Sequence, residues 1–497
     1  MKNSAAGWDD ISARIVKQFY PLFIKPLCHT LNLSISQGVF PDEMKLAKVI
    51  PLFKKGCKFK VNNYRPVSIL SIFSKILERL MFNRLLKYIN KNKILYSCQF
   101  GFRKKYATFM AVTYLVEKIS NSLDVGDFTL GVFLDFSKAF DTVNHEILFA
   151  KLECYGIRGL ANDWFKSYLS NRQQYVSIDD TESDKLSITC GVPQGSVLGP
   201  LLFLIYINDI ANVSDILYLV LFADDSNAFL SGSDVNYLVS TMNIELRKVI
   251  EWLNTNKLSL NIDKSHFMLF NRRKKVTLDP ICINGTALQR VYDTKFLGII
   301  IDSQLTWKHH LTYIKGKIAR GIGILNKARK VLTTQTLITL YYSFIYPYLT
   351  YGIEVWGGTC QRYLSGIIKL QKRIIRMISN VGRYESTVPL FKDLQLLNVT
   401  KLYCFRLLLF MYKNEHNELP DAFEGMFIRN FSIHSYVTRQ MNYFRIPRVR
   451  LEVSKQTTIY KAIEVYNKSC SLFDYTLRLG KFKQLVKMYL VNNDSLI

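Results

Sequence analysis

The sequence has no C-x-x-C pair of cysteines, no apolar run at its N-terminus and too few acidic residues to balance its basic ones. Its nine cysteines are odd in number and never form a C-x-x-C pair, which argues against a disulfide framework or a structural zinc site and predicts reduced thiols. The first ten residues are polar and end in Asp9 and Asp10, so no secretory leader is expected. The 39 Asp and Glu residues face 66 Lys and Arg residues, a net charge of +27. This excess predicts a polyanionic partner, with nucleic acid ahead of an anionic membrane.

Long apolar runs are also scarce. Residues 331–353 carry no charge, but they include Pro347, four polar residues at 333–336 and several tyrosines. A buried helical element is therefore expected there, in place of a membrane span. We expect a soluble protein of the nucleus and cytoplasm that is neither secreted nor attached to a membrane.

Hydrophobic spacing divides the chain into two parts. Helical spacing covers residues 9–40, 71–90 and 107–123, and a β-like run covers residues 47–53. Strands, helices and hairpins alternate to about residue 280, and beyond residue 300 the sequence becomes basic and helical. The pattern predicts a mixed α and β part followed by a helical part.

Acidic residues interrupt two strand-like apolar runs. Asp224 and Asp225 lie at the tip of an expected hairpin that begins with the run 216–221, and Asp135 ends the run 129–134. Aspartate is rarely buried near a strand unless it is paired or binds a cation. If the two strands are neighbours, the three carboxylates converge. Such a cluster suits two divalent cations about 3.5–4 Å apart, which clamp the oxygens of an in-line phosphoryl displacement.

A loop rich in glycine and proline, residues 190–200, opens a helix. Gly195 and Gly199 would let its backbone approach a ligand closely. The N-terminus of the helix would favour an anion or a template phosphate.

Phe140 and Asp141, which follow Asp135 in the sequence, can each be explained without catalysis. Phe140 either packs beneath a nucleotide sugar, where it would exclude a 2′-hydroxyl, or belongs to the core, and spacing alone favours the core. Asp141 is expected to cap a helix over residues 142–152.

Seven short motifs follow one another along the chain. They cover residues 64–68 (YRPVS), 99–103 (QFGFR), 135–141 (DFSKAFD), 191–200 (GVPQGSVLGP), 222–225 (FADD), 261–264 (NIDK) and 296–298 (FLG). Their order is that of the motifs of reverse transcriptases, and the chain resembles the polymerases of non-LTR (LINE-type) retrotransposons, in particular the jockey-like group. The resemblance is strong over residues 40–300 and looser over the thumb-like stretch 305–356 and the basic C-terminal part.

The resemblance implies an α+β fold of the right-hand polymerase type, with fingers and a palm built from an antiparallel sheet and helices. A helical thumb and a basic helical C-terminal region would follow. The expected domains are an N-terminal helical extension (1–40), fingers and palm (41–285), a thumb-like region (286–360) and a basic C-terminal helical region (361–497).

The resemblance also implies catalytic roles. Asp135, Asp224 and Asp225 would hold two Mg²⁺ ions, with Mn²⁺ as an alternative metal, and the carbonyl of Phe136 would be a further ligand. Lys264 would protonate the leaving pyrophosphate.

Further residues would contact the incoming nucleotide. By resemblance, Arg65 with Lys54 or Lys55 would hold the triphosphate, for which a bidentate arginine is suited. Gln194 and Gly195 would face the nucleotide and the template. Phe140 would be the sugar gate, which reverses the expectation from spacing.

Basic clusters extend the expected nucleic-acid surface. Residues 271–275 form either a turn near nucleic acid or a solvated loop. A second set would share one helical face, which either grips phosphates or is only solvated, with the first interpretation favoured: Lys369, Lys372, Arg373 and Arg376.

The sequence as a whole predicts an RNA-directed DNA polymerase with an RNA template, a DNA primer or target, and deoxynucleoside triphosphates as partners. The alternatives are a catalytically silent nucleic-acid-binding relic of such an element and an intron maturase. Related elements carry an endonuclease upstream, and neither end of this chain shows such a constellation of residues. Target nicking is therefore not expected of this polypeptide.

Overall fold

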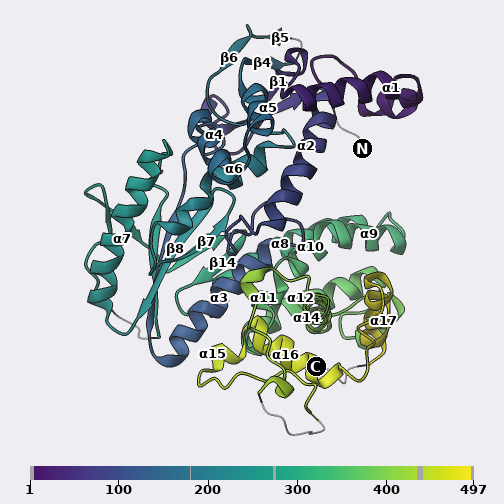
Figure 1. Ribbon diagram of the computed structural model, residues 1–497. Coiled ribbons are helices and arrows are strands. Elements are labelled where there is room, and N and C mark those ends of the chain that lie inside the picture. Colours follow the sequence, from purple (N-terminus) through teal and green to yellow (C-terminus); the bar gives the residue numbers. More distant parts are fainter. Residues whose placement is uncertain (1–4, 180, 273–275, 434–439, 494–497) are drawn as a thin grey trace.

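The computed structural model describes residues 5–179, 181–272, 276–433 and 440–493 (Figure 1). At its centre lies a five-stranded sheet in the order β12-β9-β3-β8-β7, here called the central sheet. All neighbours pair antiparallel except β12 and β9, which are parallel. Its strands are β3 (Phe128–Leu134), β7 (Tyr218–Phe222), β8 (Asp225–Gly232), β9 (His266–Phe270) and β12 (Gln289–Arg290).

The central sheet is buried on both faces. Phe133, Phe229 and Met268 belong to one core, which includes helix α3 (Thr108–Val125). Their strand neighbours Val132 and Ala228 belong to a second core, built with helices α4 (His145–Cys154), α6 (Gly199–Ile207) and α7 (Val235–Thr255). Burial on both faces explains why β3 is apolar at nearly every position without alternation, since all seven of its residues are buried.

A second sheet, here called the outer sheet, lies at the top of Figure 1. Strand β1 pairs antiparallel with β2 and parallel with β4, and β4 pairs antiparallel with β5 and β6. The helices of this part are α1 (Ala13–Gln37), α2 (Ile72–Lys91) and α5 (Leu160–Leu169). The strands are β1 (Leu46–Phe53), β2 (Tyr64–Leu70), β4 (Arg172–Ile178), β5 (Thr181–Glu182) and β6 (Leu186–Ile188).

After β9 the chain forms two small hairpins, one on either side of β12, and then helices. The hairpins are β10 (Cys282–Ile283) with β11 (Thr286–Ala287), and β13 (Asp293–Phe296) with β14 (Ile299–Asp302). The helices are α8 (Lys308–Ala328), α9 (Thr334–Phe344), α10 (Tyr346–Thr350), α11 (Ile353–Trp356), α12 (Gln361–Ile378), α13 (Val388–Asp393), α14 (Val399–Glu415), α15 (Glu452–Lys455), α16 (Thr458–Ser469) and α17 (Leu479–Asn492).

The last helices return to α3, which also packs on the central sheet. The buried carboxylate of Glu117 accepts a hydrogen bond from the backbone N–H of Ile459 at 2.7 Å. Burial raises the pKa of Glu117 to about 7. One turn further along α3, Ser120 Oγ donates to Ser454 Oγ at 3.0 Å. Residues more than 300 positions apart thus share one core.

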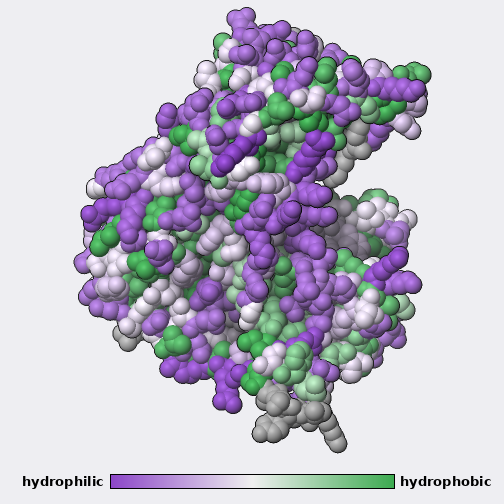
Figure 2. All heavy atoms as spheres, viewed as in Figure 1, coloured by the Kyte–Doolittle hydropathy of each residue, from purple (hydrophilic) through white to green (hydrophobic). Residues whose placement is uncertain are grey.

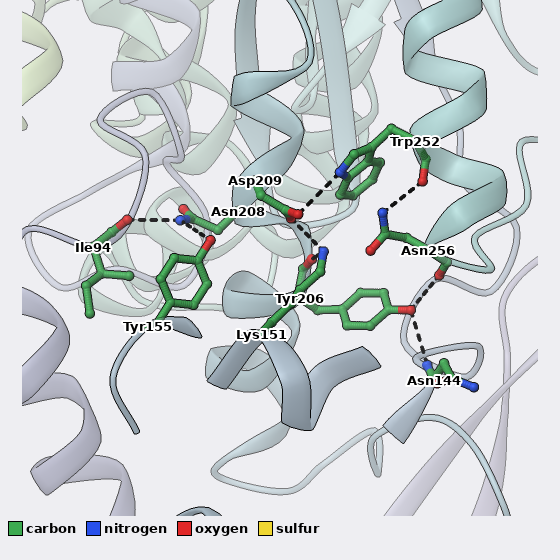
Figure 3. A network of polar contacts seen from close by, with 9 residues as sticks. All are labelled: Ile94, Asn144, Lys151, Tyr155, Tyr206, Asn208, Asp209, Trp252 and Asn256. Carbon is green, nitrogen blue, oxygen red and sulfur yellow. Dashed lines mark hydrogen bonds and ion pairs between the residues drawn. The ribbon is translucent and has the colours of Figure 1, made fainter. Parts of the chain in front are cut away.

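A polar network fixes the helices beneath the central sheet (Figure 3). The ammonium of Lys151 on α4 lies 2.6 Å from both the carbonyl of Tyr206 and Oδ1 of Asp209, and loss of hydration lowers its pKa. The indole of Trp252 on α7 donates to the other oxygen of Asp209 at 3.4 Å. The hydroxyl of Tyr206 donates to the carbonyl of Asn256 at 2.5 Å. The network ties α4 and α7 to the segment that begins with α6.

Most of the predicted elements are confirmed. The helix expected over residues 71–90 is α2, the one expected over residues 107–123 is α3, and the β-like run 47–53 lies in β1. The charge-free stretch 331–353 is helical, with α9, α10 and the start of α11, and no helix in the described part of the chain is long and apolar enough to cross a membrane. Within the basic cluster 271–275, residues 273–275 lie outside the described residues.

The prediction that Asp141 caps a helix is wrong. Helix α4 begins at His145, and its cap is Asn144, whose Oδ1 accepts from the backbone N–H of Ile147 at 3.1 Å. The chain first makes a turn, in which the N–H of Asp141 donates to the carbonyl of Lys138 at 2.8 Å. This turn leaves the Asp141 side chain free for a partner in another loop, because the helix starts three residues later than expected.

Candidate active site

The two adjacent aspartates stand on a tight turn between β7 and β8. Phe222 pairs with Asp225, so the turn consists of Ala223 and Asp224 alone. Ala223 has a φ of 57°, which a residue with a side chain adopts only at a cost. The turn is held by Gln99, whose Oε1 accepts from the backbone N–H of Ala223 at 3.1 Å.

The segment before α3 supports this turn. The N–H of Phe100 donates to the carbonyl of Leu221 at 2.8 Å, and the N–H of Leu221 donates to the carbonyl of Cys98 at 3.0 Å. Gly101 lies so close that a Cβ there would stand 2.3 Å from the backbone nitrogen of Ala223. The motif over residues 99–103 is thus explained as a backbone scaffold for the hairpin.

Asp135 reaches the same place from the end of β3. The register of β3 with β8 pairs Leu134 with Ser226, so the next residue lies beside the turn. The N–H of Asp135 donates to Ser265 Oγ at 3.2 Å, and its carbonyl accepts from the N–H of Asn261 at 2.8 Å. Its carboxylate lies 3.4 Å from the ammonium of Lys264, another of the predicted catalytic residues.

Burial and neighbouring carboxylates raise the pKa values of Asp224 and Asp225. Loss of hydration, followed by the charges of Asp224 and Asp135, raises the pKa of Asp225 to about 6. The pKa of Asp224 is also raised, first by loss of hydration and then by the charge of Asp135. Because Asp224 and Asp225 remain accessible to solvent, water screens part of this repulsion. A bound cation would relieve the repulsion among these carboxylates.

Two cations of the outer sheet face this cluster. Arg65 lies on β2 opposite Leu52 of β1, and Lys54 follows β1 directly. The charges of both oppose the rise in the pKa of Asp224, and that of Lys54 also acts on Asp225. The sequence left open whether Lys54 or Lys55 faces the site, and the electrostatics favour Lys54.

The loop over residues 190–200 packs against β2. The N–H of Ser68 donates to the carbonyl of Gln194 at 2.7 Å, and the side-chain amide of Gln194 donates to Asp141 Oδ1 at 2.8 Å. Gly195 has a φ of 125°, and a Cβ there would lie 2.4 Å from the carbonyl oxygen of Ser68. The glycine is required for this close approach between two backbones.

The start of α6 already has a carboxyl group as its partner. The buried carboxylate of Glu78, on α2, accepts from the N–H groups of Val197 (2.5 Å) and Leu198 (3.3 Å), and Ser196 Oγ accepts from the N–H of Gly199 at 2.9 Å. Burial raises the pKa of Glu78, and the charge of Arg172 opposes that rise. The expectation that this helix N-terminus receives a ligand anion is therefore wrong, because a side chain of the protein occupies it.

Phe140 lies at the border between the core and the site. Its ring stacks on the buried ring of Phe203 with centroids 4.4 Å apart, and the edge of Phe102 meets it at 6.1 Å. The side chain is only partly buried. Both interpretations of this residue are therefore compatible with its position.

The donor set fits hard divalent cations. Asp135 at the end of β3 and the Asp224–Asp225 pair at the β7–β8 turn offer carboxylate oxygens on neighbouring strands. The backbone N–H and C=O of Phe136 take no part in the bridge to Leu260, because the N–H of Ser137 and the carbonyl of Asp135 make its two hydrogen bonds. Over the described ranges, no three His, Cys, Asp or Glu side chains stand in a ready ligating arrangement.

Two residues of this site escaped the sequence analysis. Gln99 lies in a motif, but the sequence did not indicate that its side chain holds the turn at Ala223. Glu78, which accepts a hydrogen bond from Val197, looks in the sequence like an ordinary charged residue of an amphipathic helix. Glu78 occupies the same face of α2 as the buried Leu77, Met81 and Leu85, which is a signal that a charged residue points inward.

Comparisons with known proteins agree with this geometry. The family described as "Reverse transcriptase (RNA-dependent DNA polymerase)" matches residues 53–301, half of the chain. The RNA-directed DNA polymerase from mobile element jockey of Drosophila melanogaster is 29% identical over 426 residues, covering 81% of this chain and 46% of the relative.

Two further relatives extend the comparison. The probable RNA-directed DNA polymerase from transposon X-element of D. melanogaster is 28% identical over 409 residues, covering 80% of this chain and 44% of the relative. The Pol polyprotein from type-1 retrotransposable element R1 of Bradysia coprophila is 24% identical over 393 residues, covering 77% and 38%. The chain thus spans less than half the length of these relatives. It belongs to the reverse transcriptase family and is similar to the jockey-like polymerases of non-LTR retrotransposons.

Proposed function

We propose that the protein is the RNA-directed DNA polymerase of a non-LTR retrotransposon, acting on an RNA template, a DNA primer or target, and deoxynucleoside triphosphates. One observation carries the proposal: three carboxylates from β3 and the β7–β8 turn lie in one electrostatic cluster, opposite Lys54 and Arg65. A primer 3′-hydroxyl would attack the α-phosphorus of the nucleotide.

Asp135, Asp224 and Asp225, with the carbonyl of Phe136, would hold two Mg²⁺ ions, or Mn²⁺ in their place. These ions would stabilise the charge that develops on the transferred phosphoryl group.

The protein's own side chains would bind and orient the substrates. Lys54 and Arg65 would pair with the triphosphate, as would Lys55 if the loop that carries it turns inward. Lys264, which lies 3.4 Å from Asp135, would protonate the pyrophosphate. Gln194 and Gly195 would border the nucleotide and template.

The proposed domain layout follows the expected one. Residues 41–285 would form fingers and palm, with the outer sheet in the fingers and the central sheet in the palm. Residues 286–360 would form the thumb, 361–497 a basic C-terminal region and 1–40 an N-terminal extension. Figure 2 shows the molecule hollowed between the part that carries α1 and the part that carries α9, a place where a duplex would fit. Action on RNA and on a DNA target would take place in the cytoplasm and the nucleus.

Two alternatives make different predictions. A silent relic would bind nucleic acid without extending a primer, although all three carboxylates are in place. An intron maturase would assist RNA splicing, and the similarity to jockey-like polymerases disfavours it.

Primer extension on an RNA template tests the proposal. Asp135→Asn and Asp224→Asn should each lower extension by at least about 10³-fold, because losing a metal ligand removes several kcal/mol of transition-state stabilisation. RNA binding should remain. Asp184→Asn, at an exposed position on the outer sheet, is the matched control. Near-wild-type extension by either site variant would refute the two-metal assignment, and a wild-type protein that binds RNA without extension would support the relic.

A further inference from the structure

A basic cavity lies where α3, α10, α11 and α14 meet. It has a volume of about 460 Å³, within the usual range for ligand sites. The first turn of α3 and the segment around Tyr351 form two of its walls, and Arg406 and Lys413 from α14 form the third. No carboxylate is among the described residues that line it.

The two cations stand out on their helix. Helix α14 is buried along most of its length, and Arg406 and Lys413, seven residues and two turns apart, are only partly buried. Both therefore point to the same side of α14. This spacing places two positive charges on a single wall of the cavity.

The protein neutralises only one of these charges. Arg406 Nε lies 2.8 Å from Glu354, whose side chain is 2% exposed. No carboxylate of the described residues lies within the 4.0 Å of an ion pair with Lys413, and the nearby Glu418 pairs with Lys105 at 3.2 Å. Loss of hydration, followed by the charge of Arg406, lowers the pKa of Lys413, and the charges of Glu354 and Glu418 oppose this change. An added anion would relieve this crowding.

The cavity adjoins two motifs of the reverse transcriptase family. Its α3 wall follows directly on the segment over residues 99–103 that supports the catalytic turn. On the other side, the hydroxyl of Tyr351 donates to the carbonyl of Leu297, in the turn of the β13–β14 hairpin, at 2.6 Å. The same hydroxyl lies 3.2 Å from Thr108 Oγ1 at the start of α3. The cavity therefore lies beside the chain segment that supports the turn carrying Asp224 and Asp225.

We propose that this cavity binds one phosphate of the primer–template nucleic acid, held by Arg406 and Lys413. The inference rests on the proposed polymerase function, because that function supplies the strand. It assigns to α14, in the C-terminal region, a contact with nucleic acid outside the catalytic cluster. Arginine and lysine side chains are the usual partners of strand phosphates.

The first test measures acetylation of Lys413 by mass spectrometry. A lysine with a lowered pKa has more neutral amine and reacts readily, so a bound phosphate should protect it. We expect primer–template to reduce acetylation of Lys413 several-fold, while inorganic phosphate at millimolar concentration does not. Equal protection by inorganic phosphate would overturn the strand assignment in favour of a free-anion site, and absence of protection by either probe would overturn the site.

The second test uses the salt dependence of primer–template binding. Lys413→Gln should lower the slope of log Kd against log salt by about one unit, since one phosphate contact is lost. Lys455→Gln removes the same charge from α15, where Lys455 pairs with Glu452 at 3.3 Å, and should leave the slope unchanged. Equal slopes for wild type and Lys413→Gln would refute the contact. Primer extension measured in parallel distinguishes the phosphate site from the polymerase function. An active enzyme in which primer–template does not protect Lys413 would contradict only the phosphate site. A protein that binds no nucleic acid would contradict both proposals.

Discussion

The replacement Phe140→Val separates two roles of one aromatic ring. If Phe140 serves only the core, the smaller side chain costs stability and leaves the choice of sugar unchanged. If it also excludes the 2′-hydroxyl, ribonucleotides enter more readily. The ring is stacked on Phe203 yet partly exposed toward the site, so a packing loss is expected in either case.

The two effects differ in size. Truncation of a fully buried phenylalanine to alanine costs about 3–5 kcal/mol. Phe140 is only partly buried and valine keeps part of its volume, so we expect a cost of about 1–2 kcal/mol. A hydrophobic contact discriminates one small group by about 1–3 kcal/mol, which corresponds to a relaxation of sugar choice of about 10- to 200-fold.

The measurement is kcat/KM for a matched ribonucleotide and deoxyribonucleotide, taken as a ratio in both proteins. Denaturant unfolding gives the stability cost separately. Phe149→Val, the same change at a buried ring of α4, controls for loss of packing and should leave the ratio unchanged. If the folded Phe140→Val protein keeps the wild-type ratio of kcat/KM for the two nucleotides, Phe140 serves only the core.

Three further predictions follow from other parts of the structure. Lys372→Ala combined with Arg373→Ala, on the exposed face of α12, should lower the log–log salt slope of RNA binding by about one to two units, and an unchanged slope would mean that this face is only solvated. The pKa of Asp225 is raised from 3.8 to about 6. Protonated Asp225 therefore contributes fully to the free energy of unfolding below about pH 4, and this contribution is lost as the pH rises through 6. Asp225→Asn should therefore stabilise the metal-free protein by about 1 kcal/mol at pH 7, after discounting for solvent screening, and not at pH 4; equal effects in denaturant unfolding at both pH values would contradict this reasoning. Gly101→Ala should cost about 1–3 kcal/mol and reduce primer extension, because its Cβ would meet the backbone of Ala223, whereas Gly316→Ala, which meets no atom within 4 Å, should do neither.

The strands that carry the three aspartates were predictable because their signals are local. An apolar run that ends in aspartate, and an aspartate pair on a hairpin, indicate where β3 and the β7–β8 turn place their carboxylates. Adjacent pairing of β3 with β8 confirms that expectation. The catalytic and nucleotide-binding roles of the individual residues stay predictions.

Other features depend on contacts that no periodicity reveals. The role of Glu78 requires that α2 pass beneath the start of α6, which lies 119 residues further along the chain. Asp141 was misassigned because a capping residue is chosen by the local backbone, and Asn144 three residues later competes for the same role. The cavity cations on α14 become significant only once α3 and α10 are placed beside them.

The return of the last helices to α3 has a consequence for synthesis on the ribosome. Glu117 and its hydrogen-bond partner Ile459 are 342 positions apart. At about 5–20 residues per second, roughly 17 to 70 seconds separate the emergence of the two. Throughout that interval a nascent chain carries an uncovered α3, with a carboxyl group that lacks its backbone donor. A chain that ends before Ile459 would therefore leave this side of α3 exposed to proteases and chaperones.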